Sequence, residues 1–301
     1  MSKKKKINIK KIIVCLVIVI IIGVVIKAIV SKNKKEGVTE NLPVSGNEIV
    51  NANESNNTLN EVNEVSEEKT DFSQLKDSEK LGSEGLPVLM YHFFYDKSKG
   101  EKAKDGNWIE ISNFEDHLKY LTEEGYYFPS WEEVNDYIDG KTALPKKSIV
   151  LTTDDGEESF FRVALPVIKK YDVKVTNFLV TTWNGWYKND YPAKQVSYQS
   201  HSSNMHQSGS NGKGVIQTWS YDQIFKDVSD SRQILGDECI TFCYPFGHVS
   251  AVGEKAIKDA GFKMAFTTNI GRVKVGANKY ELPRLRTSTG TTLAVFKELI
   301  K

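Results

Sequence analysis

Short β-branched runs alternate with amphipathic segments from residue 86 onward, and this alternation limits the possible folds more than any other feature. Strand-like apolar runs cover residues 86–92, 126–128, 149–153, 173–180, 239–244 and 262–267. Apolar residues at helical spacing lie between them, in residues 112–125, 131–140, 160–171, 220–235 and 251–260. Strands that alternate with helices form parallel sheets, because a parallel crossover needs a helix-sized connection. We therefore expect a parallel α/β fold that is closed, or nearly closed, into a barrel.

Capping residues predict where three of these helices begin. Ser112–Glu115 and Ser130–Glu133 have the spacing of a capping box, and Ser220 precedes a third helix. Residues 181–218 lack helical periodicity and are rich in Trp, Tyr, Asn, Ser and Gly. We expect long loops there, close to a functional site.

The amino-terminal part of the chain has the pattern of a membrane anchor. Lysines precede an apolar run over residues 12–30, which is long enough for a helix to cross a bilayer of about 30 Å. No small-residue cleavage site follows the run, which favours a retained anchor over a cleaved signal peptide. The lysines before the run predict a cytoplasmic tail at 1–11, by the positive-inside rule. The rest of the chain is then expected outside the cell, with the protein in the cell membrane.

Residues 31–85 are rich in Asn, Glu, Ser and Lys, with Phe72 as their one aromatic residue. A segment of this composition buries too little apolar surface to fold, so we expect a disordered stalk followed by a folded domain at 86–301. Cys239 and Cys243 lie four residues apart in one expected strand, a separation that does not suit a disulfide. The net charge of +1 indicates no nucleic-acid partner, and no obligate protein partner is evident.

The expected strand at 149–153 ends abruptly in two acids and a glycine, Asp154-Asp155-Gly156. One interpretation is an ordinary turn, because Asp and Gly are common turn residues. The other is catalytic: side chains alternate along a strand, and a glycine turn can send two neighbouring carboxylates in different directions. One acid could then bind a metal while the other accepts a proton from water.

Two histidines five residues apart, His201 and His206, lie in the expected loop region. On a regular helix they would face different sides, whereas on a loop they can converge. Two imidazoles and one carboxylate suit Zn²⁺ or a similar divalent ion and leave positions for water and substrate. A proline turn at Cys243–Gly247 is either an ordinary β-turn or a rigid turn that aims a backbone N–H at a developing oxyanion.

Together these stretches resemble the polysaccharide deacetylase family, the carbohydrate esterases with a NodB homology domain, from about residue 86 to 301. Thr152–Gly156 stands at the family's T-F-D-D-G motif, His201–His206 at its histidine motif and Tyr244–Gly247 at its proline turn. The five-residue histidine spacing and Met90-Tyr91-His92 look more like the branch that deacetylates poly-β-1,6-N-acetylglucosamine in biofilm matrices. The resemblance implies a distorted parallel (β/α) barrel of about seven strands.

The resemblance also implies roles for individual residues. Asp154 would be the general base, and Asp155, His201 and His206 would hold one divalent metal ion, with Zn²⁺ favoured over Co²⁺ or Ni²⁺. His92 would be the general acid, and the Phe246 backbone N–H would form part of the oxyanion hole. A histidine at a strand end suits this role, because parallel barrels gather catalytic groups there. His117, by contrast, falls on a helix side expected to be exposed.

Three departures from the family pattern affect these roles. Thr153 replaces the usual aromatic residue, and Cys243 stands where many members have an arginine that orients the base. Arg284 or Arg286 is therefore expected to take over that task, while Tyr244 and Trp183 are candidate substrate contacts. No histidine follows His248, so the acid that most members carry near the C-terminus is missing, which points again to His92.

The leading functional hypothesis is a metal-dependent hydrolase of linear amides that removes N-acetyl groups from an N-acetylglucosamine polymer. The expected substrate is the poly-β-1,6-linked exopolysaccharide, with peptidoglycan of the cell wall as the alternative. A metal-dependent amidase acting on another bond would use the same residues. A hypothesis from another class is a non-catalytic glycan-binding protein whose aromatic loop stacks on sugar rings, through Trp183, Trp186, Tyr187, Tyr191 and Trp219. The presence of both the Asp pair and the His pair favours an enzyme.

Overall fold

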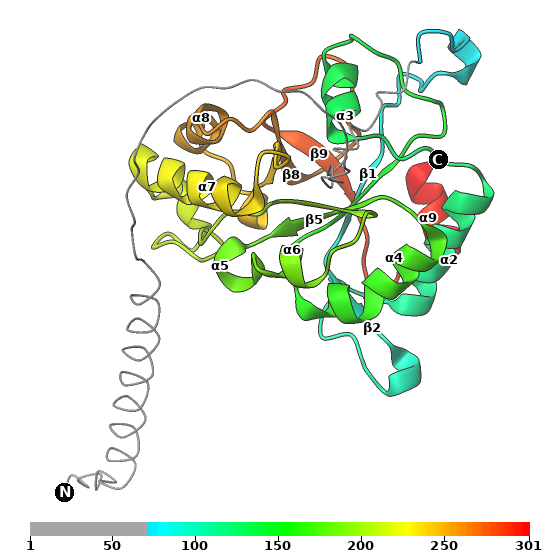
Figure 1. Cartoon of the computed structure of the whole chain (residues 1–301), viewed down its shortest axis with the longest axis horizontal. Coiled ribbons are helices and arrows are strands. Elements are labelled where there is room, and N and C mark those ends of the chain that lie inside the picture. The colour runs from blue at the N-terminus through cyan, green and yellow to red at the C-terminus, as the bar shows by residue number, and fades with distance from the viewer. Residues whose placement is uncertain (1–71) are drawn as a thin grey trace, which may run out of the picture. The chain divides into compact units, whose positions relative to one another are not determined.

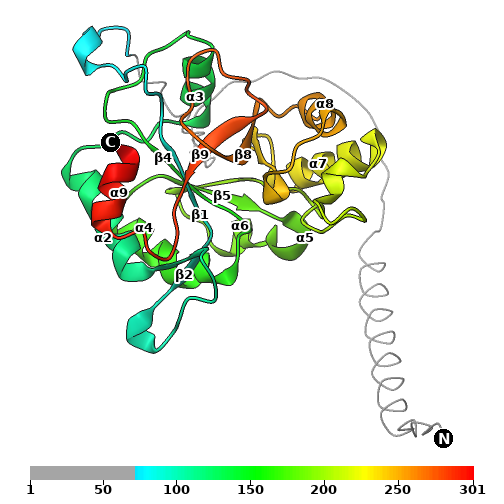
Figure 2. The same ribbon diagram turned by 180° about the vertical axis from the view of Figure 1, so that it is seen from behind.

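The computed structural model describes residues 72–301 (Figures 1 and 2). The expected tail at 1–11, the expected anchor at 12–30 and most of the expected stalk lie outside this part of the chain. No helix within residues 72–301 has the length and apolar character that a membrane span requires.

Seven parallel strands close into a barrel in the order β1-β4-β5-β6-β7-β8-β9, and β9 pairs with β1 to complete the ring. The strands are β1 (Val88–Tyr91), β4 (Val150–Thr153), β5 (Val175–Leu179), β6 (Val196–Ser200), β7 (Thr241–Cys243), β8 (Met264–Ile270) and β9 (Leu282–Arg286). Two short strands, β2 (Phe93–Tyr95) and β3 (Trp108–Glu110), form a separate parallel pair. The expected parallel barrel of about seven strands is confirmed.

Helices surround the strands in both views (Figures 1 and 2). They are α2 (Ile111–Glu123), α3 (Trp131–Ile138), α4 (Leu165–Tyr171), α5 (Thr181–Asn184), α6 (Tyr187–Asp190), α7 (Tyr221–Leu235), α8 (Ala251–Asp259) and α9 (Leu293–Ile300). A π-helical turn, η3 (Phe160–Ala164), leads into α4. Short 3₁₀ turns lie at η1 (Asp77–Glu79), η2 (Lys97–Lys99), η4 (Val215–Gln217) and η5 (Pro245–Gly247).

The expected caps are correct for two helices and wrong for one. Ser130 and Glu133 form a capping box at α3, and the Ser220 side chain accepts the N–H of Gln223 at the start of α7. Helix α2 instead begins at Ile111, directly after β3, with Glu110 in the cap position and no side-chain cap. The strand passes into the helix without a turn, so Ser112 is already inside the helix.

The alternation of side chains along the strands creates two apolar layers. One layer includes Val88, Val150 and Phe178 together with Trp131 of α3, whose Nε1 donates to Thr176 Oγ1 at 3.0 Å. The other includes the alternate residues Leu89 and Leu151, which pack against the surrounding helices. Because successive residues face opposite sides, the same alternation decides which polar side chains point into the barrel and which point towards the helices.

The prediction of long loops over residues 181–218 is wrong at β6 and at the short helices α5 and α6, and the sequence analysis also missed strand β9. Strand β6 is polar, yet Gln199 is buried, and its Oε1 accepts the N–H groups of Ile240 and Thr241, each at 2.9 Å. Strands β6 and β7 share only one paired position, Ser200 with Phe242. The Gln199 side chain therefore supplies hydrogen bonds that a longer strand ladder would make, and a polar sequence can serve as a barrel strand.

The expected domain boundary at residue 86 falls too late, because residues of the expected stalk pack against the barrel. Phe72 is only 9% exposed and meets Tyr127 edge to face, with ring centroids 5.0 Å apart. The N–H of Leu81 donates to the carbonyl of Leu144 at 2.7 Å. Phe72, together with Leu75 and Leu81 and these backbone contacts, attaches the polar segment to the apolar layer.

His117 is fully buried, so the expectation that it lies on an exposed side of its helix is wrong. Its ring stacks on Phe296 of α9 with centroids 4.1 Å apart, and its Nδ1 lies 3.1 Å from the Tyr91 hydroxyl in a hydrogen bond. Helix α9 covers this side of α2, which the sequence of α2 alone could not indicate. Burial lowers the pKa of His117 to about 4.

We expect acidification to destabilise the fold through His117. The unfolded chain binds a proton with the ordinary histidine pKa of about 6.5, whereas the folded chain resists protonation until about pH 4. The unfolded state therefore holds more protons between these values, and about 3 kcal/mol of unfolding free energy is lost as the pH falls through them. Urea unfolding at pH 7 and pH 4.5 measures this loss, and His117→Phe should reduce it. The control His248→Gln replaces a histidine that is only partly buried and should leave the loss unchanged. An equal pH effect in both variants would contradict the assignment.

Candidate active site

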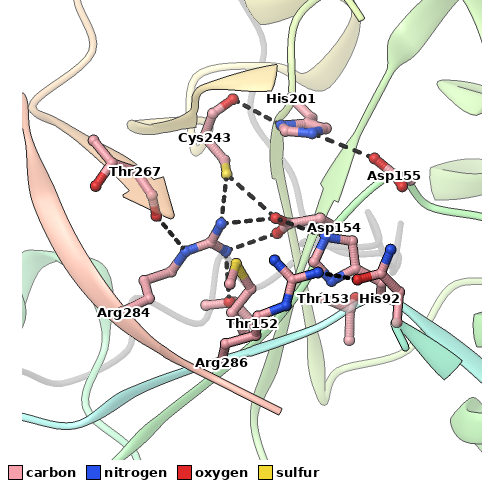
Figure 3. A network of polar contacts seen from close by, with 12 residues as sticks. His92, Thr152, Thr153, Asp154, Asp155, His201, Cys243, Thr267, Arg284 and Arg286 are labelled. Atoms are coloured by element: carbon pink, nitrogen blue, oxygen red, sulfur yellow. Dashed lines mark hydrogen bonds and ion pairs between the residues drawn. The ribbon is translucent and has the colours of Figure 1, made fainter. Parts of the chain in front are cut away.

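The polar residues singled out in the sequence meet at the carboxyl ends of the barrel strands, as Figure 3 shows. His92 follows β1, Asp154 and Asp155 follow β4, and His201 follows β6. Cys243 ends β7, and Arg284 comes from β9. Parallel barrels place their reactive groups at this end, where the loops after the strands converge.

The turn after β4 separates the two neighbouring acids. Asp155 adopts a left-handed conformation with φ of 72°, and Gly156 follows with φ of 63°. A Cβ atom on Gly156 would lie 2.3 Å from Leu179 Cδ2, so this position requires glycine. The Asn184 side chain donates to the carbonyls of Asp155 and Gly156 at 2.6 and 2.8 Å and holds the turn. As a result, the carboxylates of Asp154 and Asp155 have different partners.

Asp155 faces the two histidines of the expected metal site. Its Oδ1 lies 3.3 Å from His201 Nε2 and 3.2 Å from His206 Nε2. This oxygen is buried and accepts no hydrogen bond of ordinary geometry from the described residues. Burial would raise the pKa of the Asp155 carboxyl, but the adjacent imidazoles hold that pKa well below its usual range. One oxygen and two nitrogens thus converge as a carboxylate and imidazole set that suits a divalent ion.

The backbone fixes the orientation of His201. Its Nδ1 donates to the carbonyl of Cys243 at 2.7 Å, so Nε2 is the ring nitrogen that faces Asp155 and that a metal ion could bind in place of a proton. Metal-binding histidines commonly use the second ring nitrogen in this way, because the hydrogen bond sets both the tautomer and the ring orientation. The donor set therefore fits the divalent ion that the sequence predicts.

Asp154 is bound by Arg284, one of the two candidate arginines. Arg284 Nη1 donates to Asp154 Oδ1 and Nη2 donates to Oδ2, each at 2.7 Å, and both side chains are almost fully buried (Figure 3). Burial would raise the pKa of the Asp154 carboxyl, but the charge and hydrogen bonds of Arg284 outweigh burial and lower that pKa to about 2. Asp154 is therefore an oriented carboxylate at neutral pH.

The arginine is itself held by buried acceptors. Its Nε donates to the carbonyl of Thr267 at 3.0 Å, and Nη1 also donates to Thr152 Oγ1 at 3.0 Å. Cys243 Sγ accepts from Nη2 at 3.1 Å and lies 3.6 Å from Asp154 Oδ2. The small side chain of Cys243 thus leaves room for a guanidinium that arrives from β9. Asp154, His201 and Cys243 also lie close enough to share an ion, but the Arg284 cation in contact with two of them disfavours one there.

His92 lies beside the base. Its Nε2 is 3.8 Å from Asp154 Oδ2, and its side chain is partly exposed. Burial lowers the pKa of His92, Asp154 and Asp155 act in the opposite direction, and Arg284 and Arg286 lower it further. The imidazole is therefore mainly neutral near pH 7 before any ligand binds.

The remaining candidates occupy different places. Arg286 is exposed and hydrogen-bonds to Asn107 Oδ1, so it does not orient Asp154. Tyr244 is buried in the apolar layer that packs against the surrounding helices, the layer of Leu89 and Leu151. Neighbouring side chains face opposite sides, so Tyr244 points away from the side that Cys243 faces, and its expected substrate contact is wrong. Trp183 is 52% exposed and Phe246 is 43% exposed, with ring centroids 5.2 and 4.4 Å from that of His206.

Three of the four non-glycine residues with positive φ among residues 72–301 belong to this region. They are Asp155, Ser202 in the histidine loop and Phe246 in the proline turn, with φ of 72°, 86° and 59°. Such conformations cost free energy and persist where surrounding contacts enforce them, which is common at functional sites. At Asp155 and Phe246 the strained backbone coincides with residues that the sequence motifs had singled out.

Sequence interpretation missed Asp227, a buried carboxylate on α7. Its Oδ1 and Oδ2 accept the N–H groups of Ser203 and Asn204 at 2.8 and 2.7 Å. Burial raises the pKa of Asp227 to about 6, although these two hydrogen bonds act in the opposite direction. The available signal was its spacing: Asp227 lies three residues after Ile224, on the side of α7 that faces the barrel.

Comparison with known proteins finds sequences and folds similar to this chain. Residues 141–265 match the family model described as polysaccharide deacetylase. A curated relative from Staphylococcus aureus, named poly-beta-1,6-N-acetyl-D-glucosamine N-deacetylase, is 26% identical over 230 residues, which are 71% of this chain and 77% of the relative.

Solved structures share the fold. The Streptococcus pyogenes deacetylase PplD, solved in complex with acetate, is 26% identical with a TM-score of 0.60, covering 72% of this chain and 98% of that one. IcaB from Ammonifex degensii has a TM-score of 0.62 at 22% identity, covering 73% of this chain and 99% of that one, and supports the fold alone. The chain therefore contains a segment, residues 141–265, that matches the polysaccharide deacetylase family model, within a fold that it shares with these deacetylase structures.

Proposed function

We propose that this protein is a metal-dependent N-deacetylase of an N-acetylglucosamine polymer, with the poly-β-1,6-linked exopolysaccharide as its substrate. The observation that carries the proposal is the division of labour between two adjacent carboxylates. The Oδ1 atom of Asp155 faces two imidazoles, whereas both carboxylate oxygens of Asp154 accept hydrogen bonds from Arg284. The name of the Staphylococcus aureus relative supports the choice of glycan.

Asp155, His201 and His206 would hold the ion, for which Zn²⁺ suits the nitrogen and carboxylate donors. When bound, such an ion polarises the acetamide carbonyl and acidifies water. Asp154 is the base that takes a proton from the attacking water. Arg284 keeps this carboxylate charged and fixed in direction, and the Phe246 backbone N–H is assigned to the developing oxyanion.

His92 delivers the proton that the leaving amine needs. Because burial favours its neutral form, His92 must first take up a proton within the site. Asp154 Oδ2, 3.8 Å from His92 Nε2, is close enough to be its source. The proton removed from water thus passes through Asp154 to His92 and then to the nitrogen as the carbon–nitrogen bond breaks. Acetate and a glucosamine unit are the products, and Asp154 returns to its charged form.

His92→Gln is expected to reduce hydrolysis of the amide by about 10²-fold or more, the amount that general acid catalysis commonly contributes. Hydrolysis of an activated acetyl ester should fall much less, because its leaving group needs no proton. The measurement is kcat on both substrates with the zinc content of each preparation. Equal losses on amide and ester, or loss of the fold, would favour a structural role. His248→Gln is the matched control and should leave both rates unchanged.

The substrate is tested by offering the purified full-length protein two polymers and measuring acetate release. Poly-β-1,6-N-acetylglucosamine should release acetate in a time-dependent reaction, and peptidoglycan should release little. The reverse preference would replace the exopolysaccharide with the cell wall as substrate. Binding of either glycan by zinc-loaded protein without acetate release would support the glycan-binding alternative.

We also propose that the enzyme acts outside the cell, held in the membrane by residues 12–30 with the N-terminus in the cytoplasm. This rests on the apolar run and the lysines before it. Protease treatment of intact cells should degrade the catalytic domain if it is outside, and protection of the domain would contradict this orientation.

A further inference from the structure

We propose that Asp227 is a positioning residue for the metal site, holding the histidine loop from helix α7 so that His201 and His206 converge on Asp155. The inference rests on the proposed function, because it concerns the ion that these three residues would hold. It assigns a role to a side chain outside the deacetylase motifs of this sequence.

The hydrogen bonds of Asp227 lie between the two histidine ligands. Its two oxygens accept the consecutive N–H groups of Ser203 and Asn204, which are the second and third residues after His201 and precede His206 by three and two. A carboxylate that accepts two backbone donors makes charge-assisted hydrogen bonds, which are stronger than neutral ones. Asp227 therefore fixes the centre of the loop from which both imidazoles project.

The loop needs such support because its backbone is strained. Ser202 has φ of 86°, a left-handed value that non-glycine residues rarely adopt, and its Oγ accepts the N–H of Met205 at 3.1 Å. The strained turn directs the chain back so that residues five apart face one point. Without outside contacts, a loop of this kind would relax towards commoner backbone conformations and move the imidazoles apart.

Helix α5 supports the loop from another side. The N–H groups of Thr181 and Thr182 donate to the carbonyls of Ser202 and Ser203 at 3.0 and 3.1 Å. These contacts satisfy the carbonyls, while Asp227 satisfies the N–H groups of the following residues. Of these two supports within residues 72–301, Asp227 is the charged one, and it accepts from two consecutive residues of the loop.

Burying the Asp227 carboxylate costs free energy, and helix packing alone gives no reason for a carboxylate at this position. It is 7% exposed on the apolar face of α7, near Ile224 and Val228. Burying a carboxylate is unfavourable unless its oxygens are paired. An apolar residue would suit this face of the helix better if the face served only to pack, so we infer that the carboxylate is there for the loop.

The test is the zinc affinity of full-length Asp227→Asn, measured by competition with a chromogenic chelator. Asparagine keeps the size of the side chain but can accept with only one oxygen, and its amide group opposes the second backbone N–H. We expect the zinc dissociation constant to rise by about 10-fold to 100-fold, the range seen when groups that orient metal ligands are removed. Asp227→Glu keeps the charge at a shifted position and should give an intermediate value.

Asp230→Asn is the matched control, because Asp230 lies on the same helix but is partly exposed and pairs with Lys226. It should bind zinc as the unchanged protein does. Urea unfolding of the zinc-free proteins separates a local effect from a general loss of stability. Unchanged zinc affinity in Asp227→Asn, even with lower stability, would overturn the inference. If Asp227→Asn does not fold, an unchanged affinity in the folded Asp227→Glu variant would overturn it. If the unchanged protein binds no zinc, the proposed function fails instead.

Discussion

Asp154→Asn is expected to retain the metal ion and to lose turnover by about 10²-fold or more, the contribution that a general base commonly makes. Asparagine has nearly the same shape as aspartate but cannot take a proton from water at neutral pH. The proposed ligands Asp155, His201 and His206 are unchanged in this variant, so the ion should remain. Measuring kcat on the glycan together with zinc content per chain tests both halves of the expectation.

Asp155→Asn is the matched comparison for this variant, because it makes the same carboxylate-to-amide change at the neighbouring residue. It should weaken metal binding and activity together, since Asp155 Oδ1 faces both histidines. Loss of metal in Asp154→Asn would show that both acids are ligands and would contradict the division of roles. Circular dichroism of both variants checks that the fold is retained.

Arg284→Met is expected to lower the free energy of unfolding by about 3–5 kcal/mol, the usual cost of removing one partner of a buried ion pair. Methionine roughly preserves the apolar volume but leaves the buried Asp154 carboxylate without its cation. The pKa of Asp154 should rise from about 2, because its principal stabilising charge is gone. The acidic limb of the kcat/KM profile should then move to higher pH. Urea unfolding and the pH profile measure the two effects.

Arg286→Met is the matched control for Arg284→Met, two residues along the same strand. Arg286 is exposed and bonded to Asn107, so its replacement should change stability by no more than about 0.5 kcal/mol. The double variant Asp154→Asn with Arg284→Met should lose less stability than the sum of the two single losses. Each single change leaves the other member of the buried pair without its partner, whereas the double variant removes both members. Additive losses would show that the pair is not coupled.

The motifs predicted most of the site because they depend on local sequence. The turn at Asp154–Gly156 and the loop at His201–His206 each carry their chemistry within six residues, and strand ends bring them together in any parallel barrel. Arg284 was one of two candidates two residues apart in one strand. Only the register of β9 decides that Arg284 contacts Asp154 while Arg286 contacts Asn107.

The features that the sequence did not reveal depend on distant partners. β6 is a strand because it pairs with β5 along its whole length, with Gln199 linking it to the backbone at the start of β7, and His117 is buried because α9 covers it. Phe72 belongs to the folded part because Tyr127 offers it a contact. Asp227 faces a loop more than twenty residues earlier in the chain. In each case the local pattern was polar or ambiguous, and tertiary packing decided the outcome.

The most direct measurement of the central claim is acetate release from poly-β-1,6-N-acetylglucosamine as the full-length protein is stripped of metal with a chelator and then titrated with Zn²⁺. The account predicts no acetate release from the stripped protein. Activity should then rise in proportion to bound zinc and level off at about one ion per chain, in keeping with one set of three donors. His206→Ala should neither bind the ion nor recover activity. Full acetate release from the stripped protein, or from His206→Ala without bound metal, would contradict the account.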